Sequence, residues 1–384
     1  MAQMAQGRNK KVKVVQIIAR MNVGGPAVIV ADLMRSIDSS KVEQVLITGY
    51  CDSDEADYLE TVATDIQATR IAGLGRSVSV VSDVRAFFAL VAMIKKIAPD
   101  VIHTHTAKAG VLGRLAAILA GRSAKRVHTF HGHLLKGYFG KSKTQLVVFV
   151  EKFLAVITFR LIAIGNSVKK DLVDAKIGKD SKYEVIFPGL QPLNTYAKEE
   201  AKKSLGLESD KTYLVFVGRL TQIKRPDRLL EIARYLKVNQ PNSQILIAGA
   251  GELLETIEGV SASEGLPMTF LGWRSDIDLI LSAGDIAILC SDNEGIPLTL
   301  IQASQAGLPI VSTDVGSVSD IVIDGVTGFL TEVSSEGLIQ GITRLLENPE
   351  LRHTFGKAGE QRARDFFSSH SMVEHHQRLY SQSL

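Results

Sequence analysis

The stretch IAILCSDNEGIPLTLIQASQAGLPIVST, from Ile286 to Thr313, contains the repeating unit from which the fold can be predicted. Its apolar run 286–291 suits a buried strand, and a polar turn follows it. Pro297 is well placed for the first turn of a helix, and a second apolar run, 309–313, follows the helical segment. A strand, a helix and a second strand in this order predict a βαβ unit with parallel strands.

The same alternation fills both halves of the chain. The expected strands are 12–19, 42–49, 100–105, 125–132, 160–165 and 183–189, then 212–218, 243–249, 268–272, 286–291, 309–313 and 328–331. A charged stretch with few large apolar residues, 190–210, separates the two sets. We therefore predict an α/β protein with two Rossmann-like domains whose parallel sheets face each other across a cleft, the default ligand site. The expected domains are 1–190 and 191–365.

The composition describes a soluble globular chain that is long enough for two domains. Of its 384 residues, 45% are hydrophobic and 22% are charged. The two cysteines, Cys51 and Cys290, lie in separate halves, which argues against a disulfide framework and suits a reducing cytoplasm. Charged residues interrupt the most apolar region, 146–164, and therefore argue against a membrane span.

The net charge of +3 is unevenly distributed. The segment 101–150 contains no Asp or Glu, and its positive charges are Lys108, Arg114, Arg122, Lys125, Arg126, Lys136, Lys141 and Lys143. An electropositive surface in the first half would favour anionic lipid, phosphate or nucleic acid. No nucleic-acid motif or aromatic stacking platform accompanies these charges, so we expect no nucleic-acid partner.

Two cations follow the first strand of the second half. Arg219 and Lys224 lie on the connection between the expected strand 212–218 and a helix. A pyrophosphate suits this pair, because Arg binds it bidentately and Lys binds it as a point charge. A solvated basic turn is the open alternative.

The turn before Pro297 offers a second group of candidate residues. The free N–H groups of Leu298 and Thr299 would point at an anion, and Glu294 beside them could accept hydrogen bonds from hydroxyls. A phosphate next to a carboxylate that binds hydroxyls describes a nucleotide-sugar. Electrostatic capping of the helix by Glu294 is the alternative.

Six segments carry a resemblance to retaining glycosyltransferases of the family 4 type, which have the two-domain GT-B fold. EGIPLTLIQASQAGLPIV resembles their Glu-x7-Glu segment, and VGRLTQIKRPDRLLE resembles their donor-phosphate segment. The other four are RMNVGGPAVIV, DVIHTHTAKAGVLGRLAA, HTFHGH and SVSDIVIDGVTGFL. The resemblance runs from about residue 12 to the C-terminus. It implies a donor domain at 191–365, and an acceptor-side domain at 1–190 to which a C-terminal helix at about 366–384 returns.

The resemblance also implies roles for individual residues. Arg219 and Lys224 would neutralise the donor diphosphate as catalytic residues, together with Glu294 on the hydroxyls of the sugar and His131 at the reaction centre. The other expected donor-binding residues are Gly24 and Gly25 at the phosphates, Arg274 at the base, and Gly295, Ile296, Leu298, Thr299 and Gln302 around the sugar and ribose.

Gln302 departs from the family pattern, because the second Glu normally stands at this position. A Gln offers one acceptor and one donor, so it can still hold a ribose diol with one hydrogen bond reversed. We expect donor binding weaker by about 1 kcal/mol, since one charge-assisted hydrogen bond becomes neutral.

The expected activity is that of a metal-independent, retaining hexosyltransferase without a cofactor. No second carboxylate is available as a nucleophile, so the resemblance implies front-face substitution, in which the departing phosphate takes the acceptor proton. The expected donor is a UDP-sugar. The Asp-x-Asp in CDSDEAD (51–57) and the pairs His103/His105 and His131/His133 do not make a convincing metal site.

We expect a glycan or lipid-linked acceptor of the kind used in envelope polysaccharide or O-antigen assembly. The basic segment 125–145 would contact an anionic membrane surface and place a cytoplasmic protein at the inner face of the membrane. An ordinary loop and helix with lysines in water is the alternative for this segment. A GT-B nucleotide-sugar 2-epimerase and a non-catalytic nucleotide-sugar-binding protein are the alternative functions.

Overall fold

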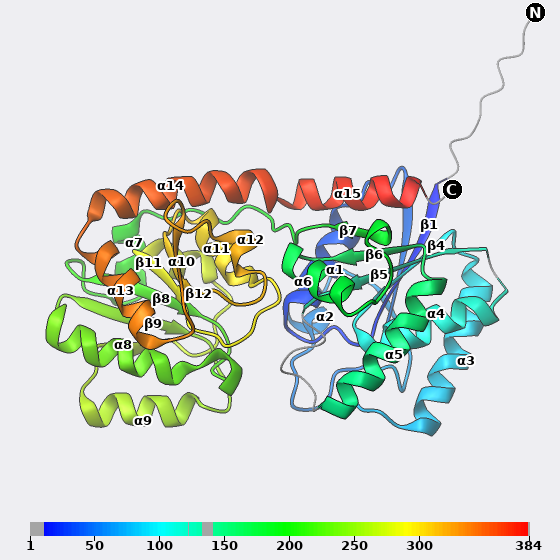
Figure 1. Cartoon of the computed structure of the whole chain (residues 1–384), viewed down its shortest axis with the longest axis horizontal. Coiled ribbons are helices and arrows are strands. Elements are labelled where there is room, and N and C mark those ends of the chain that lie inside the picture. Colours follow the sequence, from blue (N-terminus) through cyan, green and yellow to red (C-terminus); the bar gives the residue numbers. More distant parts are fainter. Residues whose placement is uncertain (1–10, 122, 133–140, 383–384) are drawn as a thin grey trace, which may run out of the picture. The chain divides into compact units, whose positions relative to one another are not determined.

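The computed structural model describes residues 11–121, 123–132 and 141–382, without the side chains of 141–143 (Figure 1). The chain divides into two compact units, each with its own parallel sheet. Unit 1 comprises Met1–Gly189 and Ser369–Leu384, and unit 2 comprises Leu190–Ser368. The sequence placed the boundary one residue later, between 190 and 191.

Unit 1 contains a seven-stranded parallel sheet in the order β3-β2-β1-β4-β5-β6-β7. The strands are β1 (Val12–Ile18), β2 (Val42–Thr48), β3 (Ala68–Arg70), β4 (Val101–His105), β5 (Lys125–Phe130), β6 (Arg160–Ala163) and β7 (Tyr183–Val185). Six of them are the strands expected in this half. β3 was not expected, because three residues are too few to show a period.

The central strand β1 is apolar on both sides because helices cover both faces of the sheet. Val12 and Val14 pack in one core, with residues of α1 (Gly25–Ser36) and α15 (Ser369–Ser381). Val15 and Ile17 pack in the other core, with residues of α3 (Val80–Ile97) and α4 (Ala107–Leu119). Alternate residues of a strand point to opposite faces, so even-numbered residues of β1 face α15.

The remaining elements of unit 1 are α2 (Tyr58–Thr61), α5 (Lys141–Ile157), α6 (Asn166–Asp174) and the short 3-10 helix η1 (Asp180–Lys182). The terminal helix α15 packs against α1 and β1, on the opposite face of the sheet from α4 (Figure 1). In the described part of the chain, no helix is both long enough and apolar enough to cross a membrane.

Unit 2 contains a six-stranded parallel sheet in the order β10-β9-β8-β11-β12-β13. The strands are β8 (Thr212–Val217), β9 (Ser243–Ala248), β10 (Met268–Phe270), β11 (Ile286–Leu289), β12 (Ile310–Thr313) and β13 (Gly328–Thr331), which confirms all six that were expected. The helical elements are α7 (Lys198–Ser204), η2 (Gln222–Lys224), α8 (Pro226–Asn239), α9 (Leu254–Glu264), α10 (Ile277–Ala283), α11 (Leu298–Gln305), α12 (Val318–Ile321), α13 (Ser335–Leu346) and α14 (Pro349–Phe366).

One residue of the expected electropositive surface lies in the interior instead. Arg114 on α4 is fully buried, and its guanidinium donates to both carboxylate oxygens of Glu151 on α5 at 2.8 Å. Its Nε also donates to the Gly110 carbonyl at 2.7 Å. Of the other cations, Lys108 pairs with Asp83 at 2.6 Å. Arg122, Lys136 and the side chains of Lys141 and Lys143 lie outside the described residues.

The Arg114–Glu151 pair gives the first testable prediction. The variant Arg114→Met leaves the Glu151 carboxylate buried without a cation, so the free energy of unfolding should fall by about 3–5 kcal/mol. The double variant Arg114→Met/Glu151→Leu removes both charges and should recover most of that loss. Urea unfolding of the three proteins measures this. A double variant as unstable as the single one would mean that packing, rather than the unpaired charge, causes the loss.

Candidate functional site

The first group of candidate residues lies where the strand order of unit 2 reverses. β8 is followed along the chain by its neighbour β9 on one side, and β11 pairs with β8 on the other side. Ligands of open parallel sheets bind at such a switch point, beyond the carboxyl ends of the strands. Arg219 follows β8 directly, and Glu294 follows β11. The fold therefore brings together two loops that are far apart in the sequence.

The structure joins Lys224 and Glu294 directly. The Lys224 ammonium donates to Glu294 Oε1 at 2.5 Å, and the Ser291 hydroxyl donates to the same oxygen at 2.5 Å. Glu294 is 9% exposed, so its charge needs these partners. The sequence predicted both residues for the site but did not predict that they would pair.

Buried contacts hold the loop that carries Lys224. The Cys290 thiol donates to the carbonyl oxygens of Lys224 and Arg225 at 3.2 Å, and burial raises the pKa of this thiol to about 12. Arg228 donates to the Cys290 carbonyl at 2.6 Å and pairs with Asp292 at 2.7 Å. The backbone N–H of Asp292 also donates to the Ile223 carbonyl at 2.9 Å. The two loops therefore form one hydrogen-bonded body.

A close approach of two backbones fixes the loop that carries Arg219. A Cβ atom on Gly249 would lie 1.9 Å from the carbonyl oxygen of Gly218, so only glycine fits there. The N–H of Gly218 donates to the Ala248 carbonyl at 3.0 Å, which continues the β8–β9 pairing into the loops. Arg219 is exposed, and no carboxylate among the described residues pairs with it. It is therefore a cation held on a rigid loop and open to an anion.

Helix α11 begins at Leu298, with Pro297 as its N-cap, so Pro297 lies one position earlier than expected. Leu298, Thr299 and Gln302 are half-buried residues of this helix. The side chain of Ile296 is buried, so only its backbone could take part in donor binding.

Neighbouring loops support the start of α11. The Gly295 carbonyl accepts from the N–H of Ser317 at 3.0 Å. The hydroxyl oxygens of Ser317 and Thr221 are buried without a hydrogen-bond partner among the described residues. Unpaired buried hydroxyls are uncommon in folded proteins and are consistent with a site that a polar ligand completes.

Arg274 lies after β10 and pairs with Asp276 two residues later, with its Nε 2.8 Å from the carboxylate. This pairing commits the side chain, so the expected contact to a base would have to come from the Arg274 backbone, as the resemblance implies. Within the described part of the chain, no hydrogen bond links Arg274 to Lys224 or Glu294.

In unit 1 the corresponding switch point lies between β1 and β4. Gly24 is the N-cap of α1, which begins at Gly25 after β1. A Cβ atom on Gly24 would have one neighbour within 4 Å, the Asn22 carbonyl oxygen at 3.9 Å, and the φ of Gly24 is 167°. Neither the local backbone nor the local packing requires glycine here. A closely approaching ligand would require it.

His131 follows β5 and belongs to a hydrogen-bonded group that the sequence did not reveal. Its Nε2 lies 2.9 Å from His105 Nδ1, and His105 Nε2 lies 2.9 Å from Gln16 Oε1. His103 lies 2.7 Å from both the Tyr380 and the Thr129 hydroxyl oxygens. Because β4 and β5 are neighbours in the sheet, His103, His105 and His131 meet on the α15 side. His133 lies outside the described residues.

Burial keeps these histidines neutral. It lowers the pKa of His131 to about 3 and that of His376 to about 4, and it lowers the pKa of His103, His105 and His128 well below the usual value. The rings also disfavour one another's charged forms. Among the described residues, no group of three or more His, Cys, Asp and Glu side chains has the arrangement of a metal site.

Two family descriptions match the chain, one for each half. Residues 23–192 match Glycosyltransferase Family 4, and residues 197–362 match Glycosyl transferases group 1. The chain is 32% identical over 306 residues to an Escherichia coli enzyme named UDP-Gal:alpha-D-GlcNAc-diphosphoundecaprenol alpha-1,3-galactosyltransferase, covering 77% of this chain and 78% of that one. The chain belongs to the group 1, family 4 glycosyltransferases. The resemblance read from the sequence is thereby confirmed.

Another relative agrees with this assignment, and two solved structures share the fold. The glycosyltransferase CapM of capsular polysaccharide biosynthesis in Staphylococcus aureus is 24% identical over 85% of this chain and 88% of its own. HepE from Anabaena, solved with UDP and glucose, has a TM-score of 0.82 at 20% identity, over 97% of this chain and 100% of that one. Sucrose-phosphate synthase from Thermosynechococcus elongatus gives 0.82 at 21% identity, over 97% and 99%. These structures confirm the predicted GT-B fold.

The neutral histidines of this glycosyltransferase give a prediction for its stability against pH. Below pH ~6.5 the unfolded chain protonates histidines that the folded chain keeps neutral, so the unfolded state binds more protons. The free energy of unfolding should therefore fall as the pH drops from about 6.5 to about 4, by roughly 1.4 kcal/mol per pH unit for each such histidine. Urea unfolding between pH 7 and about pH 5 measures the slope.

A pair of variants separates this cause from general acid sensitivity. His376→Asn removes one buried histidine and should make the slope shallower, whereas His353→Asn, at an exposed position of α14, should leave it unchanged. Equal slopes for the two variants would show that burial of His376 does not contribute to the acid sensitivity.

Proposed function

We propose that this glycosyltransferase transfers a hexosyl group from a UDP-sugar, with retention of configuration, to a lipid-linked acceptor in envelope polysaccharide assembly. The observation that carries the proposal is the hydrogen-bonded contact between the loop after β8 and the loop after β11 in unit 2. These two loops hold the unpaired cation Arg219, the Lys224–Glu294 pair and the start of α11 at one switch point. The name of one relative supports the donor and the acceptor, since that enzyme uses UDP-Gal and a diphosphoundecaprenol-linked sugar.

The charges at this edge suit a diphosphate that is attached to a sugar. Arg219 is unpaired among the described residues, and α11 has no acidic residue in its first turn. Glu294 is already neutralised by Lys224, so its remaining acceptor capacity can bind hydroxyls without strong repulsion of the phosphates. Gln302 would bind the ribose diol through one acceptor and one donor.

The proposed reaction needs no protein nucleophile. The bond from the anomeric carbon to the β-phosphate oxygen breaks while the acceptor oxygen forms a bond on the same face. The acceptor proton passes to the departing phosphate oxygen, and Arg219 and Lys224 stabilise the charge that develops on UDP. Retention follows, because the new bond takes the place of the old one. Positive side chains supply the charge that a metal ion would otherwise supply, so we propose metal-independent transfer.

Nucleotide binding tests the donor class. UDP at a hundred times its Kd should stabilise the protein by about 2.7 kcal/mol, visible as a rise in the melting temperature, and GDP and ADP should give smaller shifts. The variant Lys224→Ala should abolish the UDP shift, because it removes one phosphate cation and leaves Glu294 without its ion pair. The matched control is Lys211→Ala, whose half-buried cation pairs with the exposed Glu208 before β8, at the opposite edge of the same sheet. Equal shifts in the two variants would contradict the proposed binding of the diphosphate by Lys224.

Incubation with a sugar conjugate of the nucleotide that binds then tests the stereochemistry and the metal requirement of the transfer. Incubation with a lipid diphosphate acceptor in excess EDTA should give a product with the anomeric configuration of the donor, as read from proton coupling constants. An inverted product would refute front-face transfer, and loss of activity in EDTA would refute metal independence. Release of an epimeric sugar without acceptor would favour the epimerase.

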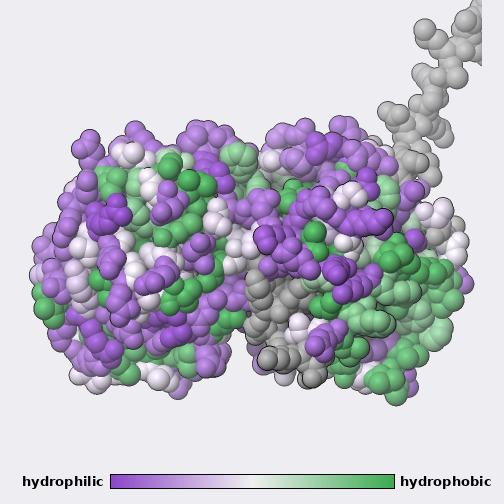
Figure 2. Space-filling view, viewed as in Figure 1, coloured by the Kyte–Doolittle hydropathy of each residue, from purple (hydrophilic) through white to green (hydrophobic). Residues whose placement is uncertain are grey.

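Unit 1 exposes an apolar face that fits a membrane surface. Leu146, Phe149, Phe153 and Val156 lie on one side of α5 and are 58 to 75% exposed. Val80, Val81, Val84 and Phe88 of α3 are also exposed. Figure 2 shows hydrophobic residues gathered over the region of α3 and α5. Aromatic and aliphatic side chains on one face of a helix are typical of interfacial binding.

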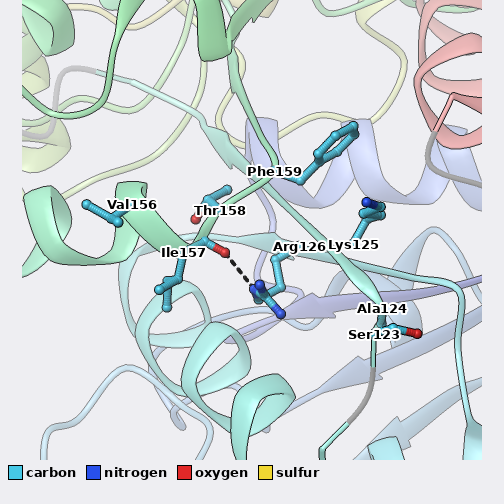
Figure 3. Close-up of a pocket in the computed structure, with 8 residues that line it drawn as sticks. All are labelled: Ser123, Ala124, Lys125, Arg126, Val156, Ile157, Thr158 and Phe159. Atoms are coloured by element: carbon cyan, nitrogen blue, oxygen red, sulfur yellow. Dashed lines mark hydrogen bonds between the residues drawn. The ribbon is translucent and has the colours of Figure 1, made fainter.

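Cations border this face. A hollow of about 400 Å³ at the C-terminal end of α5 is lined by 123–126 and 156–159, so Val156 belongs both to the apolar face and to the hollow (Figure 3). Lys125 is exposed, and Arg126 donates to the Ile157 carbonyl at 2.6 Å. Lys152 is exposed on α5 between the two phenylalanines. Positive charge beside an apolar face matches an anionic leaflet.

Vesicle binding tests this membrane contact. The protein should co-sediment with vesicles containing phosphatidylglycerol and much less with pure phosphatidylcholine vesicles, and high salt should weaken the binding. The double variant Phe149→Ser/Phe153→Ser should lower the recovered fraction several-fold, because it removes apolar area from the contact. Trp273→Ser removes an equally exposed aromatic residue from unit 2 and should have no effect. Equal recovery with both lipids, or of both variants, would contradict the assigned face.

A further inference from the structure

A chain of hydrogen bonds runs through unit 1 and ends at His131. It begins at the backbone carbonyl of Leu33, which accepts from Gln44 Nε2 at 3.0 Å. Gln44 Oε1 accepts from Gln16 Nε2 at 3.2 Å, and Gln16 Oε1 lies 2.9 Å from His105 Nε2. His105 Nδ1 lies 2.9 Å from His131 Nε2. Side chains from β2, β1 and β4 thus connect α1 to the residue after β5.

The first member of this chain fixes the direction of every later bond. A carbonyl can only accept, so the Gln44 amide must turn its NH2 toward Leu33 and its oxygen toward Gln16. Gln16 must then donate through its NH2 to Gln44. The oxygen of Gln16 therefore faces His105. His105 Nε2 therefore carries a hydrogen, and in a neutral ring Nδ1 is then an acceptor. That acceptor requires a hydrogen on His131 Nε2.

The Tyr380 hydroxyl reinforces the orientation of Gln16. Gln16 Nε2 donates to this hydroxyl at 3.0 Å, so both amide hydrogens of Gln16 have acceptors on the side away from His105. The hydroxyl can then donate to His103 Nδ1 at 2.7 Å. The opposite direction would place Gln44 Oε1 against the Leu33 carbonyl oxygen, and two acceptors would then face each other.

The last atom of the chain has no hydrogen-bond partner among the described residues. His131 Nδ1 is buried and forms no hydrogen bond with any described residue. Burial favours the neutral ring at both His105 and His131, which the deduced pattern requires. With its hydrogen held on Nε2, His131 presents only a lone pair at Nδ1. This nitrogen can accept a hydrogen bond but cannot donate one.

We propose that Gln44, Gln16 and His105 are positioning residues that hold His131 as its Nε2–H tautomer, so that Nδ1 accepts a hydrogen bond from a hydroxyl of the bound sugar. The second half of this statement rests on the proposed function, whereas the first half concerns the protein alone. Among the groups of a nucleotide-sugar, a sugar hydroxyl can satisfy Nδ1 and an ionised phosphate oxygen cannot, because only the hydroxyl carries a hydrogen.

The tautomer can be measured on the full-length protein without any ligand. Two-bond proton–nitrogen correlation spectra of protein with 15N-labelled histidine distinguish protonated from unprotonated ring nitrogens. The variant His131→Asn identifies the His131 signals by their loss. We expect a protonated Nε2 and an unprotonated Nδ1. The reverse pattern, or a ring protonated at both nitrogens at neutral pH, would overturn the proposal.

Two variants test whether the chain sets the tautomer. Gln16→Met removes the link between Gln44 and His105 and should give His131 signals of mixed tautomers. Tyr380→Phe removes a buried hydroxyl of the same network but leaves the chain from Leu33 to His131 intact, so it should keep the Nε2–H pattern even if it lowers stability. An unchanged tautomer in Gln16→Met would show that the chain does not position His131.

Titration with UDP-galactose and with UDP then tests the hydroxyl contact. UDP-galactose should shift the Nδ1 signal of the wild-type protein and UDP should not. Gln16→Met should raise the Kd of UDP-galactose about tenfold while leaving that of UDP unchanged. Binding of UDP-galactose without a shift of Nδ1 would refute the contact. Failure of both ligands to bind would count against the UDP donor, while the tautomer measurement would still decide the role of the chain.

Discussion

The pairing of β1 with β4 at the centre of the first sheet is the constraint on which unit 1 depends. The register sets Gln16 beside His103 and Ile18 beside His105. Because side chains alternate, Ile17 and Ile102 of these strands lie in the α3–α4 core, whereas Gln16, His103 and His105 lie on the α15 face beside Val14. A shift of one residue would exchange these two sets and bury Gln16, His103 and His105 among the leucines and valines of the other core.

Unit 2 meets a different requirement with the same topology. A site that binds an anion needs at least one cationic side chain that is not paired with a carboxylate of the protein itself. Lys224 is paired with Glu294, yet Arg219 is kept apart on a loop whose path is set by the contact of Gly218 with Gly249. The thiol of Cys290 and the guanidinium of Arg228 bind backbone carbonyls and so hold the Lys224 loop without placing a further charge at its open side.

The sequence predicted the strands well because buried parallel strands are short apolar runs. It proposed Arg219, Lys224 and Glu294 as site residues because each lies in the connection that follows such a run, and their role stays a prediction. It could not predict that Arg114 lies inside, since its partner Glu151 is 37 residues away and both look like ordinary surface charges. The contact between His105 and His131 was missed for a similar reason. It depends on β4 and β5 being neighbours in the sheet, and the local pattern of apolar residues does not predict the order of the strands. The two glycines of the stretch GAG at 249–251 were a visible signal of close backbone approach that the sequence analysis did not use.

The two units prepare their groups for opposite kinds of ligand atom. Unit 2 offers cations and free N–H groups, which attract oxygens that only accept. Unit 1 offers, at His131, a neutral ring whose free nitrogen only accepts, and it keeps that ring neutral by burial instead of by a charged partner. A protonated His131 would attract phosphate oxygens through its charge, as a lysine does. The lone pair of Nδ1 repels phosphate oxygens and accepts a hydrogen bond from a hydroxyl. The hydrogen-bonded chain from Leu33 would therefore let the protein distinguish a hydroxyl from a phosphate, which additional positive charge could not do.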